Sequence, residues 1–262
     1  MTSRPHYHFP FSLLAPRIPS LLLGRRRALH ADVNAAFAAI GAAPHAVNAE
    51  HILQREPFLL VMNHFHRRDI PSWWMVMAVM KAVADQRAGH APPDLRMIVA
   101  TQWTYTNPWQ KIFVAPVMRF VVGRIMRAYD FLPMEPTALG ASHANQRARS
   151  IRGVVVAAKQ ARQAQFPIGL APEGGDTLDS ALRRPPNGAG RFMLLLAATG
   201  LPFLPVGVYV SNERLVTNFG TLFALRAPPA LSKGETDEWA SREVMERIAC
   251  LLPAELRGAY DG

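Results

Sequence analysis

Hydrophobic positions along the chain fall into short unbroken runs that alternate with longer amphipathic segments. A short continuous apolar run is typical of a buried strand, whereas apolar residues spaced three and four apart predict a helix. Strands are predicted at residues 57–62, 95–101, 128–134, 166–175, 201–210 and 214–225. Helices are predicted at residues 27–43, 71–84, 145–165, 190–200 and 236–253. This alternation predicts an α/β fold, a mixed, mostly parallel sheet flanked by helices.

Several of these segments carry residues that favour a helix end. Gly41 and Gly200 stand where two predicted helices finish, a position at which glycine is common. Asp69 stands just before Pro71, which suits a helix start. Thr236 is the expected N-cap of the last helix, because its side chain can accept a hydrogen bond from a free backbone N–H group.

The apolar run at 57–62 stops abruptly. Asn63 comes next, followed by His64, His66, Arg67, Arg68 and Asp69. On a regular helix His64 and Asp69 would point about 140° apart, whereas in a turn between a strand and a helix they can meet. A carboxylate bonded to one imidazole nitrogen leaves the other as a base for a substrate hydroxyl. Open α/β folds bind ligands at the carboxyl ends of strands, so these two residues are the candidate catalytic pair.

Three other interpretations of this segment stay open. A purely structural hydrogen bond between His64 and Asp69 is one, and a solvated charged loop is another. A metal site is the third, because His64 and His66 alternate. The His-x-His-x-Asp-His spacing of metal-dependent hydrolases fails, however, at Arg68 and Asp69. The neighbouring arginines also repel a cation, so no metal is expected.

Four blocks of sequence, taken in their order along the chain, carry a family resemblance. "NHFHRRD" at 63–69 resembles an Asn-His-x4-Asp signature, and "RAYDFLPME" at 127–135 lies where a Gly-x-x-Phe-Ile-x-Arg block is expected. "LAPEGGD" at 170–176 is similar to Phe-Pro-Glu-Gly-Thr-Arg, and residues 187–209 resemble a glycine-to-helix stretch with a Val-Pro-Val strand. Together these blocks resemble the glycerolipid acyltransferases, which include the glycerol-phosphate and lysophosphatidic acid acyltransferases.

The resemblance implies both a fold and a reaction. The fold implied is glycerol-phosphate acyltransferase-like. Apart from the resemblance, we expect an acyltransferase domain at residues 51–262 and an N-terminal helical segment at residues 1–50, which either packs on the surface or lies at the membrane interface. In that family the histidine activates an acceptor hydroxyl for attack on an acyl thioester, from acyl-CoA or acyl carrier protein. His64 is then the general base and Asp69 the residue that orients it. The thioester is a co-substrate, and no other cofactor is implied.

Glu173, Gly174 and Gly175 fall on the third block, which in the family is associated with acceptor binding. A turn made by two glycines offers backbone amides suited to an anionic group or a developing oxyanion. The alternative for the same turn is a tight exit from a strand, which needs a residue with positive φ. The resemblance therefore implies that these three residues bind substrate.

Two departures from the family pattern concern the acceptor. Met134 stands where the second block ends in an arginine, and Gly175-Asp176 replaces the Thr-Arg of the third. The candidate replacements for these phosphate-binding arginines are Arg67, Arg68, Arg183, Arg184 and Arg191. The expected reaction is acyl transfer to a glycerol-phosphate or lysophospholipid hydroxyl. Two alternatives stay open: the same chemistry on a non-phosphorylated lipid or sugar hydroxyl, and a non-catalytic lipid-binding protein.

The net charge limits the classes of binding partner, and the single cysteine limits disulfide bonding. The net charge of +10 favours anionic partners, such as a membrane surface or a phosphorylated molecule. The arginines are scattered, without zinc-finger cysteines or a long basic helix, so no nucleic acid partner is expected. The chain has one cysteine, Cys250, which excludes a disulfide framework and is expected to be buried.

Membrane contact is expected at the surface of the bilayer. No apolar run reaches the length of about 18 residues that a membrane span needs. Residues 109–127 mix aromatic, apolar and basic residues, as interfacial segments do. Trp73 and Trp74 line an acyl channel, dock on lipid or pack in the core. The protein is therefore expected to be cytoplasmic and peripheral on the inner face of the cell membrane.

Overall fold

A computed structural model describes residues 7–9, 11–67, 69–90, 94–102, 107–136, 143–175 and 181–261. Within these residues one seven-stranded sheet has the strand order β1-β7-β6-β2-β5-β3-β4. The strands are β1 (His45–Val47), β2 (Leu59–Met62), β3 (Arg96–Ala100), β4 (Leu132–Met134), β5 (Ile168–Leu170), β6 (Phe203–Ser211) and β7 (Arg214–Phe219). Neighbouring strands pair in parallel except β6 and β7, which are antiparallel. The predicted mixed, mostly parallel sheet is therefore confirmed.

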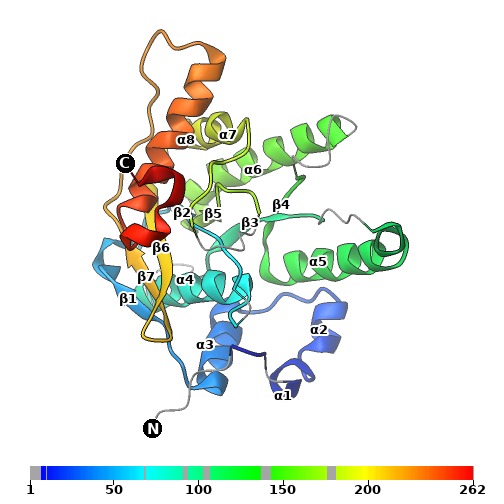
Figure 1. The fold of residues 1–262 in the computed structure, drawn as a ribbon. Coiled ribbons are helices and arrows are strands. Elements are labelled where there is room, and N and C mark those ends of the chain that lie inside the picture. Colours follow the sequence, from blue (N-terminus) through cyan, green and yellow to red (C-terminus); the bar gives the residue numbers. More distant parts are fainter. Residues whose placement is uncertain are drawn as a thin grey trace.

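Helices cover both faces of the sheet (Figure 1). They are α1 (Phe11–Leu14), α2 (Ile18–Leu22), α3 (Leu29–Ile40), α4 (Ser72–Arg87), α5 (Ala115–Tyr129), α6 (Ala144–Ala164), α7 (Ala189–Ala197) and α8 (Lys233–Ala249). A π-helical segment, Gln110–Val114, leads into α5. Helices α3 and α4 pack on one face of the sheet, whereas α6, α7 and α8 pack on the other.

The two cores follow from the alternation of side chains along β2. Leu60 and Met62 point to the face covered by α3 and α4, whereas Leu59 and Val61 point to the opposite face. All four are fully buried. This explains why the run at 57–62 is continuously apolar: a strand covered on both sides has no polar face.

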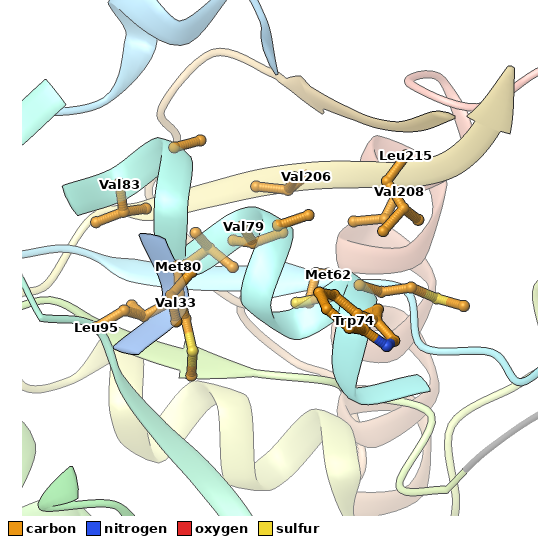
Figure 2. Packing of buried hydrophobic residues seen from close by; sticks show 14 of the residues in the cluster. Val33, Met62, Trp74, Val79, Met80, Val83, Leu95, Val206, Val208 and Leu215 are labelled. Atoms are coloured by element: carbon orange, nitrogen blue, oxygen red, sulfur yellow. The ribbon is translucent and has the colours of Figure 1, made fainter. Parts of the chain in front are cut away.

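Trp74 belongs to the core and not to a lipid-facing surface. Its ring packs against Phe37 with a centroid distance of 5.2 Å and against Tyr7 at 5.6 Å. Figure 2 shows Trp74 and Val79 of α4 facing the apolar side chains of the sheet. Trp73 points outward instead and is 53% exposed. Of the three interpretations of this pair, core packing therefore holds for Trp74.

Most predicted element ends are confirmed, and one is wrong. Gly41 follows α3 in the left-handed conformation with φ +64°, and Gly200 has φ +82° after α7. Thr236 is not the N-cap of the last helix, because α8 begins one turn earlier. Ser232 caps it, accepting from the Glu235 N–H group, while the Glu235 carboxylate accepts from the Ser232 N–H group. This reciprocal capping box stabilises the helix start more fully than a lone threonine.

The predicted burial of Cys250 is also wrong, because this residue is exposed. Cys250 is the C-cap of α8 and the last position of its amphipathic pattern. Ile248 and Ala249 face the core, whereas the next position points toward solvent. The apolar neighbours along the sequence therefore do not share its face of the helix.

A buried arginine ties together the segments that lead into β2 and β5. The Arg87 side chain is fully buried at the end of α4. Its guanidinium donates to the carbonyl oxygens of Leu53 and Gln165, each at 2.6 Å, and of Glu56 at 2.9 Å. Since a buried cation needs such acceptors, these contacts fix the two chain segments relative to α4.

The N-terminal helices are held by one carboxylate. Asp32 of α3 accepts hydrogen bonds from Arg17, Arg27 and Tyr129, at distances from 2.6 to 2.8 Å. Burial alone would raise the pKa of Asp32, but these three donors outweigh it and lower the pKa from 3.8 to about 2. Asp32 therefore joins α3 to the segment beside α2 and to the end of α5. Division of the chain at residue 50 stays a prediction.

Candidate active site

Asn63 ends β2 and directs the chain out of the sheet. Its Oδ1 atom accepts from the Val208 N–H group at 2.6 Å, and its Nδ2 atom donates to the Val208 carbonyl at 2.8 Å. A buried side chain thus takes the place of the next backbone pairing between β2 and β6. The main chain is released from the ladder at this point, so His64 is presented at the carboxyl end of β2.

The loop that carries His64 is held by two apolar residues and a tight turn. Phe65 and Ile70 are buried, with 2% and 1% of their surface exposed. The Arg67 N–H group donates to the Ile70 carbonyl at 3.1 Å, and the Ile70 N–H group donates back at 3.2 Å. His64 and Arg67 remain half-buried between these anchors. The loop therefore holds a titratable side chain at the edge of the sheet where open α/β folds bind ligands.

Glu173 fixes the backbone of His64 from the neighbouring strand. Its Oε2 atom accepts from the His64 N–H group at 2.8 Å, and its Oε1 atom accepts from the Arg183 N–H group at 3.0 Å. Burial raises the pKa of Glu173, although both backbone hydrogen bonds act in the opposite direction. The described hydrogen bonds of this carboxylate hold the backbone of two other segments in place. A role of Glu173 in binding the acceptor stays a prediction.

The glycine turn after β5 has a structural reason for its first glycine. Gly174 has φ +70°, a conformation that side chains other than glycine rarely adopt. Its N–H group donates to the Ala171 carbonyl at 3.3 Å and closes the turn. Gly175 has open space around it, since an added Cβ would meet nothing within 4 Å. Of the two predicted oxyanion donors, the Gly174 amide is thus occupied within the turn.

Asp69 lies on the same loop as His64 but contacts Arg67. The two carboxylate oxygens accept from Arg67 at 3.1 and 3.0 Å, and the carboxylate is 62% exposed. Among the residues that the structure describes, no hydrogen bond joins Asp69 to His64. The structure therefore brings these two residues onto one short loop without joining them. Arg68 and Asp176 lie outside the described residues.

A polar network beside Met134 was not predicted from the sequence. Glu135, directly after β4, is buried and accepts from Thr101 at 2.6 Å and from Gln102 at 2.8 Å. His143 Nδ1 lies 2.8 Å from the same carboxylate. Burial raises the pKa of Glu135, but the hydrogen bonds outweigh it and the pKa is lowered. Because β2, β5, β3 and β4 run in parallel, this network lies at the same edge of the sheet as His64.

One feature of the sequence could have indicated this network, a polar side chain directly after a short predicted strand. Glu135 follows the predicted strand at 128–134, as His64 follows the strand at 57–62. Its partners, however, come from β3 and from the start of α6. A search for motifs within single segments cannot join them. In the described part of the chain, no group of three or more His, Cys, Asp or Glu side chains is arranged to hold a metal ion.

Comparisons with known proteins identify the family of this chain. The family model described as Acyltransferase matches residues 44–209. A comparison with curated proteins gave no match. The chain is similar to the solved structure of the 1-acyl-sn-glycerophosphate (LPA) acyltransferase PlsC from Thermotoga maritima. That similarity has 14% identity and a TM-score of 0.49 and covers 82% of this chain and 75% of the other.

The family match confirms the resemblance seen in the sequence blocks. It runs from the residue before β1 into β6 and includes the loop of His64 and the turn of Glu173. The matched region therefore contains the whole edge of the sheet that carries the candidate site. Because the match extends over more than half of the chain, the protein belongs to the Acyltransferase family.

Proposed function

We propose that the protein transfers a fatty acyl group from an acyl thioester to a hydroxyl of a glycerolipid acceptor, with His64 as general base. One observation carries the proposal. His64 lies at the carboxyl end of β2, inside the region matched by the family model, with its backbone held by Glu173. A base on a fixed backbone can be placed against an acceptor hydroxyl, as proton abstraction requires.

The proposed reaction needs no covalent intermediate on the protein. The His64 imidazole takes the proton of the acceptor hydroxyl as its oxygen attacks the thioester carbonyl carbon. The tetrahedral intermediate then expels the thiolate, and the imidazolium returns the proton to sulfur. One ester and one free thiol are formed, and His64 ends in its starting state. Acyl-CoA and acyl carrier protein are the two proposed donors.

Asp69 orients His64 in this proposal only after it leaves Arg67. Both partners of that ion pair are exposed to solvent, Arg67 by 40% and Asp69 by 62%. Exposed ion pairs are worth only about 0–1 kcal/mol, so an anionic group of a substrate can displace the carboxylate. Arg67 would then bind the substrate anion while Asp69 turns to the imidazole. Binding of the substrate anion would thus account both for substrate binding by Arg67 and for orientation of His64 by Asp69.

A phosphorylated acceptor is our first candidate, and a neutral one is the second. The net charge of +10 and the arginine in the His64 loop favour glycerol phosphate or a lysophospholipid. A non-phosphorylated lipid or sugar hydroxyl is favoured by Met134, which occupies the place of an arginine in the family pattern. The two candidates differ in one measurable property, the dependence of activity on the acceptor phosphate.

We also propose that the protein docks on the inner face of the cell membrane through α2, the π-helical segment and α5. Exposed apolar side chains gather on these elements. They include Leu22, Leu23, Trp109, Ile112, Phe113 and Phe120. Exposed Arg25 and Arg26 lie close by in sequence, and basic side chains beside apolar ones favour anionic bilayers. No described helix is long and apolar enough to cross a bilayer.

The test is thiol release from a long-chain acyl-CoA in the presence of different acceptors. Glycerol phosphate, lysophosphatidate and neutral hydroxyl lipids are compared, with His64→Ala as the inactive variant. His66→Ala is the matched control, because it removes a second imidazole from the same loop. We expect acceptor-dependent release that falls by about 100-fold or more in His64→Ala and stays near wild type in His66→Ala. A non-catalytic lipid-binding protein would release no thiol with any acceptor.

A further inference from the structure

A cavity of about 660 Å³ lies between the turn after α2, helix α5 and the ends of β3 and β4. Its charged lining consists of Arg26, Arg119, Arg127 and Asp130. Met126 and Phe131 add apolar surface. The cavity opens next to the polar network of Glu135, because Thr101 lines the cavity and donates to that carboxylate. It is thus both basic and apolar, at the same edge of the sheet as His64.

The charges of this cavity leave an excess of positive charge. Its one lining carboxylate, Asp130, is already paired with Arg96 at 2.9 Å, and Arg96 is not part of the lining. Asp130 also lies 3.7 Å from Arg26, a longer contact. Arg127 makes no ion pair or hydrogen bond with any residue in the described part of the chain. An anion entering the cavity therefore meets guanidinium groups whose charge the protein itself does not balance.

Arg119 is held in place by a chain of hydrogen bonds that starts in the core. Its guanidinium donates to the Gln102 side-chain oxygen, and the Gln102 side-chain amide donates to Glu135 at 2.8 Å. Glu135 is itself buried. A guanidinium held in this way loses less freedom on binding a ligand, which favours recognition of an anion. The buried network thus has an effect at the surface, where it orients Arg119.

Gly24 allows Arg127 to lie against the turn after α2. This glycine has φ +61°, and an added Cβ would come within 3.0 Å of the Arg127 side chain. The Cδ atom of Arg127 therefore lies close to this turn, and Arg127 lines the cavity. A second hollow, of about 470 Å³, is lined by Arg119 and Phe120. Arg119 therefore lines both hollows.

From this arrangement we propose that the cavity binds the phosphate group of a phosphate-bearing amphiphile through Arg119 and Arg127. The second hollow and the exposed apolar side of α5 receive the alkyl part. The two arginines supply positive charge to the cavity, which Pro133 of β4 also lines, whereas Met134 packs on the opposite face of the sheet. The proposal rests on the proposed function and adds to it the class of acceptor, a lysophosphatidate-like molecule. Its phosphate lies in the cavity, at the same edge of the sheet as His64.

The test separates binding from catalysis. Binding of lysophosphatidate is measured by calorimetry on His64→Ala protein, which leaves the cavity intact. Arg119→Gln and Arg127→Gln are introduced into that background. Arg152→Gln on α6 removes the same charge from an exposed site elsewhere and serves as the control. We expect each cavity variant to weaken binding by about tenfold or more and the control to leave it unchanged, because a charge-assisted hydrogen bond is lost. Arg119→Lys restores part of the binding if its charge is what matters.

The ligands distinguish the source of the phosphate. Weakened binding of both glycerol phosphate and lysophosphatidate assigns the cavity to the acceptor. Weakened binding of vesicles that contain phosphatidate, with both acceptors unaffected, assigns it to a membrane lipid. Equal loss of affinity for lysophosphatidate and for monoacylglycerol, or no loss in either arginine variant, overturns the phosphate site. If the arginine variants lose binding while His64→Ala retains thiol release, the cavity stands and the proposed catalytic base is wrong.

Discussion

The Oε2 atom of Glu173 accepts a hydrogen bond from the backbone N–H group of His64 at 2.8 Å, across 109 positions of sequence. The contact joins the turn after β5 to the loop after β2, two strands that are paired in the sheet. It fixes the backbone from which the proposed base projects. The other carboxylate oxygen accepts from Arg183, so Glu173 links three segments at one edge of the sheet.

Replacing Glu173 by glutamine is expected to lower kcat more than it changes KM. Two backbone N–H groups converge on the two carboxylate oxygens, and glutamine offers only one acceptor oxygen. The N–H group that faces the new amide nitrogen loses its acceptor, and for the partly buried His64 N–H group this costs about 1–3 kcal/mol. The measurement is steady-state thiol release together with the melting temperature. Glu238→Gln, an exposed position on α8, is the control. A variant that folds with wild-type kcat would show that this contact does not position His64.

Replacing Asn63 by alanine is expected to destabilise the fold and to loosen the end of β2. The Val208 N–H and carbonyl groups both lose their partner, and each unsatisfied group costs about 1–3 kcal/mol. Urea unfolding measures the loss, and amide hydrogen exchange at Val208 locates it. Asn34→Ala removes an exposed amide that contacts only Lys81 among the described residues, so it is expected to change stability little. Unchanged exchange at Val208 in the Asn63 variant would contradict the account.

Asp32 makes the docking of the N-terminal helices depend on acidity. Its pKa is about 2 in the folded protein and 3.8 in the reference state. A carboxyl group with a lowered pKa stabilises the fold above its unfolded pKa and loses that effect as the pH falls through its folded pKa. The shift corresponds to about 2 kcal/mol, present above pH 4 and lost toward pH 2.

The difference in unfolding free energy between wild type and Asp32→Asn is therefore expected to shrink as the pH falls from 5 toward 2. Asp85→Asn is the control. Asp85 forms an ion pair with Lys81, but its side chain is 52% exposed. Urea unfolding at several pH values gives both curves. A wild-type minus Asp32→Asn difference that does not change with pH would show that Asp32 does not supply this stability.

Removing the exposed aromatic rings before α5 is expected to weaken membrane binding. Trp109 is 57% and Phe113 is 67% exposed, and their rings pack edge to face at 6.3 Å. Trp109→Ser combined with Phe113→Ser is expected to lower the fraction that floats with anionic vesicles by about tenfold, because two large apolar groups no longer leave water. Leu195→Ser on α7 is the control. An equal loss of vesicle binding in the double variant and in Leu195→Ser would contradict docking through this face.

The sequence predicted what depends on local pattern. The four-residue strand β2 and the abrupt change to polar residues at Asn63 are visible in the order of the residues, and this order placed His64 at a strand end. Gly41 and Gly200 were read correctly because a left-handed residue after a helix has a strong compositional signal. Ser232 was not predicted as the N-cap, although Ser-x-x-Glu is a local signal for a helix start. Thr236 was predicted instead because it lies closer to the apolar residues of the helix.

Contacts between distant segments account for most of the remainder. Nothing around Asn63 indicates Val208, which lies 145 positions away, and nothing around Glu173 indicates the His64 backbone. The expected His64–Asp69 contact stays a prediction, because Asp69 pairs with Arg67 in this structure. Spacing shows that two residues can meet, but not that Arg67, two positions from Asp69, meets it first. The network around Glu135 was missed because its members come from three separate elements.

The central claim, acyl transfer with His64 as base, is tested most directly by following the acyl group itself. Wild type and His64→Ala are incubated with lysophosphatidate and an acyl-CoA that carries an isotopic label in its acyl chain. Mass spectrometry then quantifies the labelled ester and labelled free fatty acid. The account predicts labelled ester from wild type and at least about 100-fold less from His64→Ala. Label found only in free fatty acid, or equal ester formation by the two proteins, would contradict it.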